Sequence, residues 1–75
     1  MNRVHYTVSG LNNIQIKTQV KNILSEVKGV SMVNIDLGRG SIEVGYNDSA
    51  NENEIMKSIE LAGCRIENGV FDRSL

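Results

Sequence analysis

Few side chains in this sequence can bind a metal ion or act as a nucleophile. The chain has one cysteine, Cys64, and one histidine, His5, which lie near opposite ends of the sequence. Neither has a recognisable catalytic signature around it, and there is no Ser-His-Asp, Cys-His or paired-carboxylate motif. We therefore expect that the protein is not an enzyme. A single cysteine also excludes an internal disulfide.

Charge and composition exclude further classes of function. Eight basic and nine acidic residues leave a net charge of −1, and there are two tyrosines, one phenylalanine and no tryptophan. Nucleic-acid binding usually requires a basic surface and aromatic stacking platforms, and this composition provides neither. No apolar run approaches the ~18 residues of a membrane span, and the amino terminus alternates where a signal peptide would be continuously apolar. We expect a cytoplasmic domain that neither binds nucleic acid nor inserts into a membrane.

Local patterns divide the chain into six elements of one small domain, since 75 residues leave no room for a second. Alternating apolar and polar residues predict four strands, over residues 4–8, 30–37, 42–46 and 64–67. Apolar residues at helical spacing predict two helices, over 13–28 and 50–62. Asn12 with Gln15, and Ser49 with Glu52, are the expected capping pairs. Residues 68–75 are expected to form a loose tail.

The order of these elements is β-α-β-β-α-β, the pattern of the ferredoxin-like split βαβ fold. Each strand has one apolar face and each helix one apolar stripe, as a two-layer sandwich requires. We predict an α+β domain over residues 1–67, with a four-stranded antiparallel sheet and both helices on one face. The other face of the sheet, which includes His5, is expected to be open to water.

Four segments closely resemble one family, the heavy-metal-associated domain of copper chaperones and copper-transporting ATPases. They are Val8-Ser9-Gly10-Leu11, Lys28-Gly29-Val30, Ile42-Glu43-Val44-Gly45-Tyr46-Asn47 and Ile59-Glu60-Leu61-Ala62-Gly63-Cys64. The resemblance extends over about residues 2 to 67 without a gap. It implies the same ferredoxin-like fold, with a metal-binding turn between the first strand and the first helix.

In that family the turn carries the motif G-M-x-C-x-x-C, whose two thiolates hold Cu(I), Zn(II) or a related soft ion. The matching segment here is Gly10-Leu11-Asn12-Asn13-Ile14-Gln15-Ile16. Asn13 and Ile16 therefore occupy the cysteine positions, and an amide or an alkyl group is a poor ligand for a soft metal. The resemblance therefore implies a domain that has lost its dithiol site and holds no metal cofactor firmly. Such a domain is expected to work as a protein-interaction or adaptor module.

Two alternatives remain open. In the first, Cys64, which the resemblance places opposite the turn, binds copper or zinc weakly, alone or across a homodimer. In the second, the chain is a small-ligand regulatory domain of the ACT type, which has the same order of elements and a glycine after its first strand.

A protein partner or a second copy would meet the surface around the turn. Ile14 is the candidate for an exposed apolar contact, because the turn is exposed in the family. Lys17, Lys21 and Lys28 give the first helix a basic side, whereas Glu52, Glu54 and Glu60 make the second helix acidic. Such charges either orient a partner or form two solvated helix faces.

Overall fold

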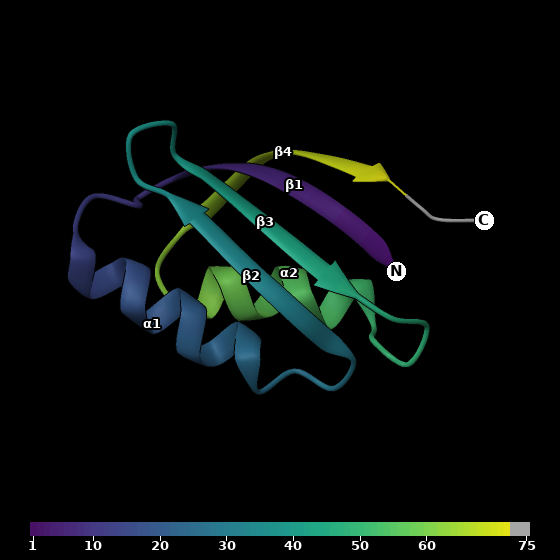
Figure 1. Cartoon of the computed structure of the whole chain (residues 1–75). Coiled ribbons are helices and arrows are strands. Elements are labelled where there is room, and N and C mark those ends of the chain that lie inside the picture. The colour runs from purple at the N-terminus through teal and green to yellow at the C-terminus, as the bar shows by residue number, and fades with distance from the viewer. Residues whose placement is uncertain (73–75) are drawn as a thin grey trace.

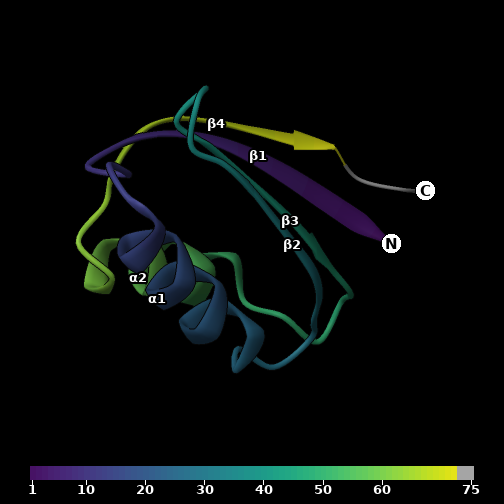
Figure 2. The same ribbon diagram turned by 60° about the vertical axis from the view of Figure 1, so that its left-hand side comes forward.

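A computed structural model describes residues 1–72 of the chain. The elements follow the predicted order: β1 (Asn2–Ser9), α1 (Ile14–Ser25), β2 (Val30–Asp36), β3 (Ser41–Tyr46), α2 (Glu52–Leu61) and β4 (Arg65–Asp72). All strand pairs are antiparallel, in the sheet order β2-β3-β1-β4. Both helices cover the same face of this sheet (Figure 1, Figure 2). The predicted α+β ferredoxin-like sandwich is confirmed.

The core lies between the sheet and the helices. Alternate residues of β1 and β3 turn inward and meet the apolar stripes of the helices, and eight side chains are the largest that are fully buried: Val4, Tyr6, Val20, Leu24, Ile42, Val44, Ile55 and Ile59. Leu11, in the turn after β1, is buried with them. Neither described helix is long and apolar enough to cross a bilayer.

Both helices are shorter than predicted, and the expected capping residues are wrong. The side chain of Asn13, not Asn12, caps α1, and that of Asn51, not Ser49, caps α2 by accepting from the backbone of Asn53 and Glu54. The backbone N–H of Ser49 instead donates to the Asn47 side chain at 2.9 Å, within the preceding turn. Asparagine and serine both cap helices well, so their types alone do not decide between neighbouring candidates.

The last strand extends into the segment predicted to be a loose tail. Residues 68–72 pair with β1, with Phe71 opposite Val4 and Gly69 opposite Tyr6. The register shifts at Thr7/Val8, and this irregularity breaks the alternation from which a strand is predicted. A Cβ at Gly69 would lie 3.1 Å from the Tyr6 ring, so the glycine there allows close packing. Residues 73–75 of the expected tail lie outside the described residues.

Tyr6 is nearly fully buried, and its hydroxyl has no hydrogen-bond partner among residues 1–72. Burial, reinforced by Tyr46 and Glu52, raises the pKa of Tyr6 from 10.0 to about 12. The folded protein therefore keeps a proton that the unfolded chain releases as the pH rises above 10, and stability falls across this interval.

We predict that Tyr6→Phe keeps or slightly raises the free energy of unfolding at pH 7, by up to about 1 kcal/mol, because an unsatisfied buried hydroxyl is costly. The variant should also lose less stability than the unmodified chain between pH 10 and 12. Urea unfolding at several pH values measures both effects. A loss of more than about 2 kcal/mol at pH 7 would show that the hydroxyl has a stabilising partner.

Candidate functional site: the turn between β1 and α1

The turn from Gly10 to Asn13 lies against the loop that connects α2 to β4 (Figure 1). Gly10 has a φ of +88°, and a Cβ on it would lie 2.8 Å from the carbonyl oxygen of Gly63 and 3.5 Å from Cα of Cys64. Only glycine combines this conformation with such a close approach. The two loops therefore form one end of the molecule, where the family resemblance places its metal site.

Asn13 has a structural role at the first of the two cysteine positions. Its side-chain oxygen accepts a hydrogen bond of 2.9 Å from the backbone N–H of Ile16, and its carbonyl accepts one of 3.1 Å from the N–H of Lys17. The amide thus satisfies a helix-terminal donor that would otherwise lack a partner. Ile16, at the second cysteine position, is half-buried and packs against the core.

We predict that Asn13→Ala lowers the free energy of unfolding by about 1 kcal/mol, the usual effect of removing a capping side chain. Asn12→Ala is the matched control, because Asn12 is an exposed neighbour of the same type and does not cap α1. This substitution should change stability by less than about 0.5 kcal/mol. Urea unfolding of the two variants measures the difference, and equal losses would contradict the assignment of the cap.

Cys64 lies beside the turn, but its thiol is poorly suited to bind a metal. The side chain belongs to the core cluster, with 4% of its surface exposed. Burial raises the pKa of the Cys64 thiol above its usual value of 9.0. Because the thiolate is the form that binds soft metals, this environment disfavours the ligand. Whether Cys64 binds a metal ion remains a prediction.

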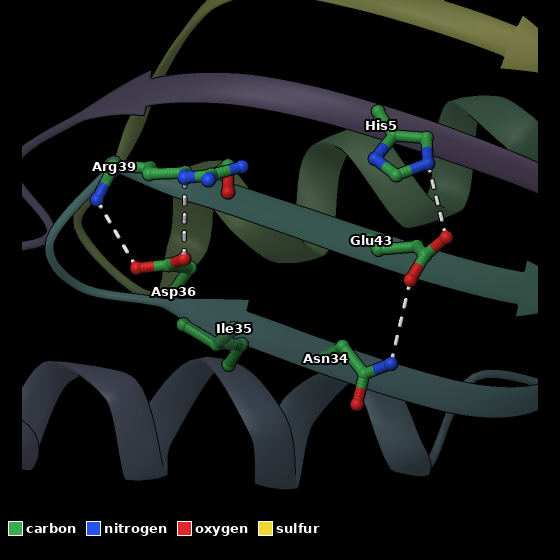
Figure 3. A pocket seen from close by; sticks show the side chains of 7 residues that line it. His5, Asn34, Ile35, Asp36, Arg39 and Glu43 are labelled. Atoms are coloured by element: carbon green, nitrogen blue, oxygen red, sulfur yellow. Dashed lines mark hydrogen bonds and ion pairs between the residues drawn. The ribbon is translucent and has the colours of Figure 1, made fainter.

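His5 lies on the open face of the sheet, as the alternation predicts, and not beside Cys64. Its Nε2 is 3.0 Å from Oε2 of Glu43 on the neighbouring strand β3 (Figure 3). The side-chain amide of Asn34 donates to the other oxygen of Glu43 at 3.3 Å. Over residues 1–72, no three or more histidine, cysteine, aspartate or glutamate side chains are grouped to hold a metal ion.

A shallow polar depression of about 430 Å³ surrounds this pair, and the sequence analysis missed it. It is lined by His5, Asn34, Ile35, Asp36, Arg39, Ser41 and Glu43 (Figure 3). Arg39 and Asp36 pair within it at 3.8 Å, so its charged groups are engaged with one another. The depression depends on the register between β2 and β3 and on the conformation of the hairpin that joins them, and an alternating pattern specifies neither.

Two large apolar side chains are exposed at the end of the helical layer that contains the turn. Ile14, the first residue of α1, is 73% exposed, and Leu61, the last residue of α2, is 81% exposed. Lys21 and Lys28 are exposed and Lys17 is half-buried. The sequence analysis missed Leu61, although its position beside the apolar stripe of α2, between Ile59 and Ala62, was a usable signal.

Comparison with known proteins identifies the structural neighbours of this fold. No family model matches the chain, and no curated protein matches it in sequence. The CopZ metallochaperone superposes with a TM-score of 0.80 and 25% identity, over 85% of this chain and 97% of that one. A copper-binding domain of the P-type ATPase HMA7 gives 0.81 and 22%, over 97% and 96%. The yeast copper transporter domain CCC2A gives 0.81 and 24%, over 93% and 100%.

These neighbours agree with the resemblance seen in the sequence. They are metallochaperone and metal-binding domains rather than enzymes. At the turn, Asn13 and Ile16 occupy the positions where the family resemblance places cysteines, and the sequence has no CxxC motif. The chain therefore has the ferredoxin-like fold of the heavy-metal-associated domains, with copper chaperones and P-type ATPase copper-binding domains as its structural neighbours, and its own sequence has no CxxC motif.

Proposed function

We propose that this chain is a heavy-metal-associated-type domain that has lost the dithiol site and binds a partner protein through the end of the molecule around the turn. One observation carries the proposal: the side chain at the first cysteine position caps α1, while the next residue, Ile14, is exposed to solvent. A hydrogen bond within the protein thus fixes the start of α1 at the position where the family resemblance places a metal ligand. Exposed apolar patches rimmed by polar residues mark protein-binding sites, and Ile14 and Leu61 are both exposed at this end of the helical layer.

The chemistry of the nearby groups supports a role that does not depend on a metal. Ile16 offers no lone pair, and Cys64 is buried, which raises the pKa of its thiol and disfavours the thiolate. The proposed domain is non-catalytic and cytoplasmic, and it uses the inherited scaffold as an adaptor. The competing function is weak copper or zinc binding at Cys64, which the copper-binding structural neighbours favour.

The charges of α1 indicate the kind of partner. Lys17 and Lys21 are its charged residues, and the helix has no acidic side chain in its first turn. Neither lysine is within 4.0 Å of a carboxylate among residues 1–72. A partner that complements this helix would place acidic side chains opposite the lysines and an apolar pocket opposite Ile14.

Site-specific photo-cross-linking tests this proposal. A photoreactive residue replaces Ile14 in one variant and Asp48 in another. Asp48 is exposed and belongs to the loop between β3 and α2, which lies at the opposite end of the sheet from the turn (Figure 1). We expect a defined protein adduct from position 14 only. The adduct should fall about tenfold when Lys17→Glu and Lys21→Glu are added, since exposed ion pairs contribute up to about 1 kcal/mol each.

Two results would reject the proposed surface. One is equal cross-linking from positions 14 and 48, which indicates non-specific contact. The other is an adduct at position 14 that does not respond to reversal of the lysine charges.

A further inference from the structure

Two methionine side chains that are far apart in the sequence lie together on the sheet. Met1 immediately precedes β1, and Met32 belongs to β2. A Cβ built on Gly45 of β3 would lie 2.9 Å from Sδ of Met1, 3.1 Å from Cβ of Met32 and 3.4 Å from Cε of Met32. The two side chains therefore meet over this glycine and bury it.

The register of the sheet places this meeting point on the open face. Met32 pairs with Gly45, and the residue before it in β3, Val44, is fully buried on the side of the helices. Successive side chains of a strand point to opposite faces, so a side chain at position 45 would point away from the helices. The missing side chain of Gly45 leaves the space in which the two thioethers lie.

Both sulfur atoms face polar groups and not the core. The hydroxyl of Ser31 donates to Sδ of Met1 at 3.7 Å. The side-chain amide of Asn34 donates to Sδ of Met32 at the same distance. Met1 is also 63% exposed, whereas Met56, on α2, packs against the core cluster. The first two thioethers therefore offer lone pairs that a ligand can reach from solvent.

We propose that Met1 and Met32 bind a soft monovalent cation, Cu(I) or Ag(I), between their sulfur atoms. Thioethers are soft ligands that select such ions. Methionine has three rotatable side-chain bonds, so the two sulfur atoms can close on an ion while the strands stay in place. Binding needs no deprotonation of either ligand, in contrast to binding at a thiol.

The surroundings of the site limit its affinity and separate it from the turn. Both ligands are neutral, and Arg3 lies opposite Gly45 on the neighbouring strand, where its positive charge opposes a cation. We therefore expect binding no tighter than micromolar. The amino terminus lies at the opposite end of the sheet from the turn between β1 and α1 (Figure 1). The site is thus independent of the partner surface proposed above.

NMR of the chain labelled with carbon-13 at its three methionine methyl groups, during titration with Ag(I), tests the site. Ag(I) is a soft ion that is stable in air, and each methyl group reports on its own sulfur. We expect the Met1 and Met32 signals to shift together with one dissociation constant, while the Met56 signal stays in place. Titration of Cys64→Ser should give the same result. Zn(II), which proteins bind through thiolate, imidazole and carboxylate, should shift none of the three signals.

Met32→Leu keeps an apolar side chain over Gly45 and removes one sulfur. The Met1 signal of this variant should require at least about tenfold more Ag(I) for half of its shift, the smaller effect seen when even an outer-shell partner is lost. Met56→Leu is the matched control and should leave the titration unchanged. Circular dichroism establishes that each variant is folded.

Three results would overturn the proposal. The first is a titration in which the Met1 and Met32 signals do not move, and the second is an equal response of Met56. The third is a Met1 response that Met32→Leu leaves unchanged, which would show that the two sulfur atoms share no ion. Cross-linking at position 14 is read separately, so failure of the thioether site leaves the proposed turn surface standing.

Discussion

A variant that carries Asn13→Cys and Ile16→Cys is expected to bind Cu(I) at least about 100-fold more tightly than the unmodified chain. Changes in the outer-shell partners of metal ligands alter affinity by about 10- to 100-fold, and the addition of two direct ligands should have at least the larger of these effects. The substitutions place two thiols at the start of α1, where the helix terminus lowers a thiol pKa and favours the thiolate. The fold already matches copper-binding domains. The prediction therefore tests whether two thiols at positions 13 and 16 are enough to form a Cu(I) site on this fold.

Competition with a chelator of known Cu(I) affinity measures the gain. The matched control carries Asn13→Ser and Ile16→Ser, which changes the same positions without adding sulfur. This control should bind Cu(I) no better than the unmodified chain. If the double-cysteine variant also fails to gain affinity while it remains folded, then the turn differs from the metal turn of its structural neighbours in more than its ligands.

The substitution Gly29→Ala is expected to destabilise the domain by about 3 kcal/mol or more, since it combines left-handed strain of 1–2 kcal/mol with overpacking of 1–3 kcal/mol. Gly29 has a φ of +87°, and its Cβ would lie 2.5 Å from the backbone nitrogen of Ala50 and 2.8 Å from the side-chain oxygen of Asn47. Its carbonyl also accepts a hydrogen bond of 2.9 Å from the N–H of Asn47. A shift of this backbone therefore disturbs the connection between β3 and α2.

Gly63→Ala is the control for this prediction. Gly63 has a similar φ of +99°, but apart from its two chain neighbours no residue among 1–72 has a heavy atom within 4 Å of a Cβ built there. The loss should therefore be limited to backbone strain, about 1–2 kcal/mol. Urea unfolding of the two variants compares them directly, and equal losses would show that the contacts of Gly29 are not as close as described.

The fold could be predicted from the sequence because its signals are local and periodic. Val4, Tyr6 and Val8 alternate as a half-buried strand requires, and Val20 and Leu24 lie at helical spacing. Gly29 marks the reversal after α1 and is a residue that tolerates a positive φ. These predictions agree with the structure because the same residues that form the patterns also form the core.

Other features depend on contacts between distant residues, and periodicity does not reveal them. The extension of β4 to Asp72 depends on pairing with β1, and the register shift conceals it in the sequence. Asn13 rather than Asn12 caps α1 because the helix begins at Ile14. The start of the helix depends on the path of the turn, which packs through Gly10 against Gly63 in a distant part of the sequence. The degree of burial of Cys64 likewise depends on the packing of both layers.

A Cu(I) titration of the unmodified chain against a competing chelator, followed by backbone amide chemical shifts, tests most directly whether the turn works without a metal. We expect no sub-micromolar affinity, no localised shifts at Asn13 and Ile16, and the same result for Cys64→Ser. Sub-micromolar binding with shifts centred on the turn, or binding that Cys64→Ser abolishes, would contradict the proposed function. Either result would indicate that the domain binds copper or a related metal ion.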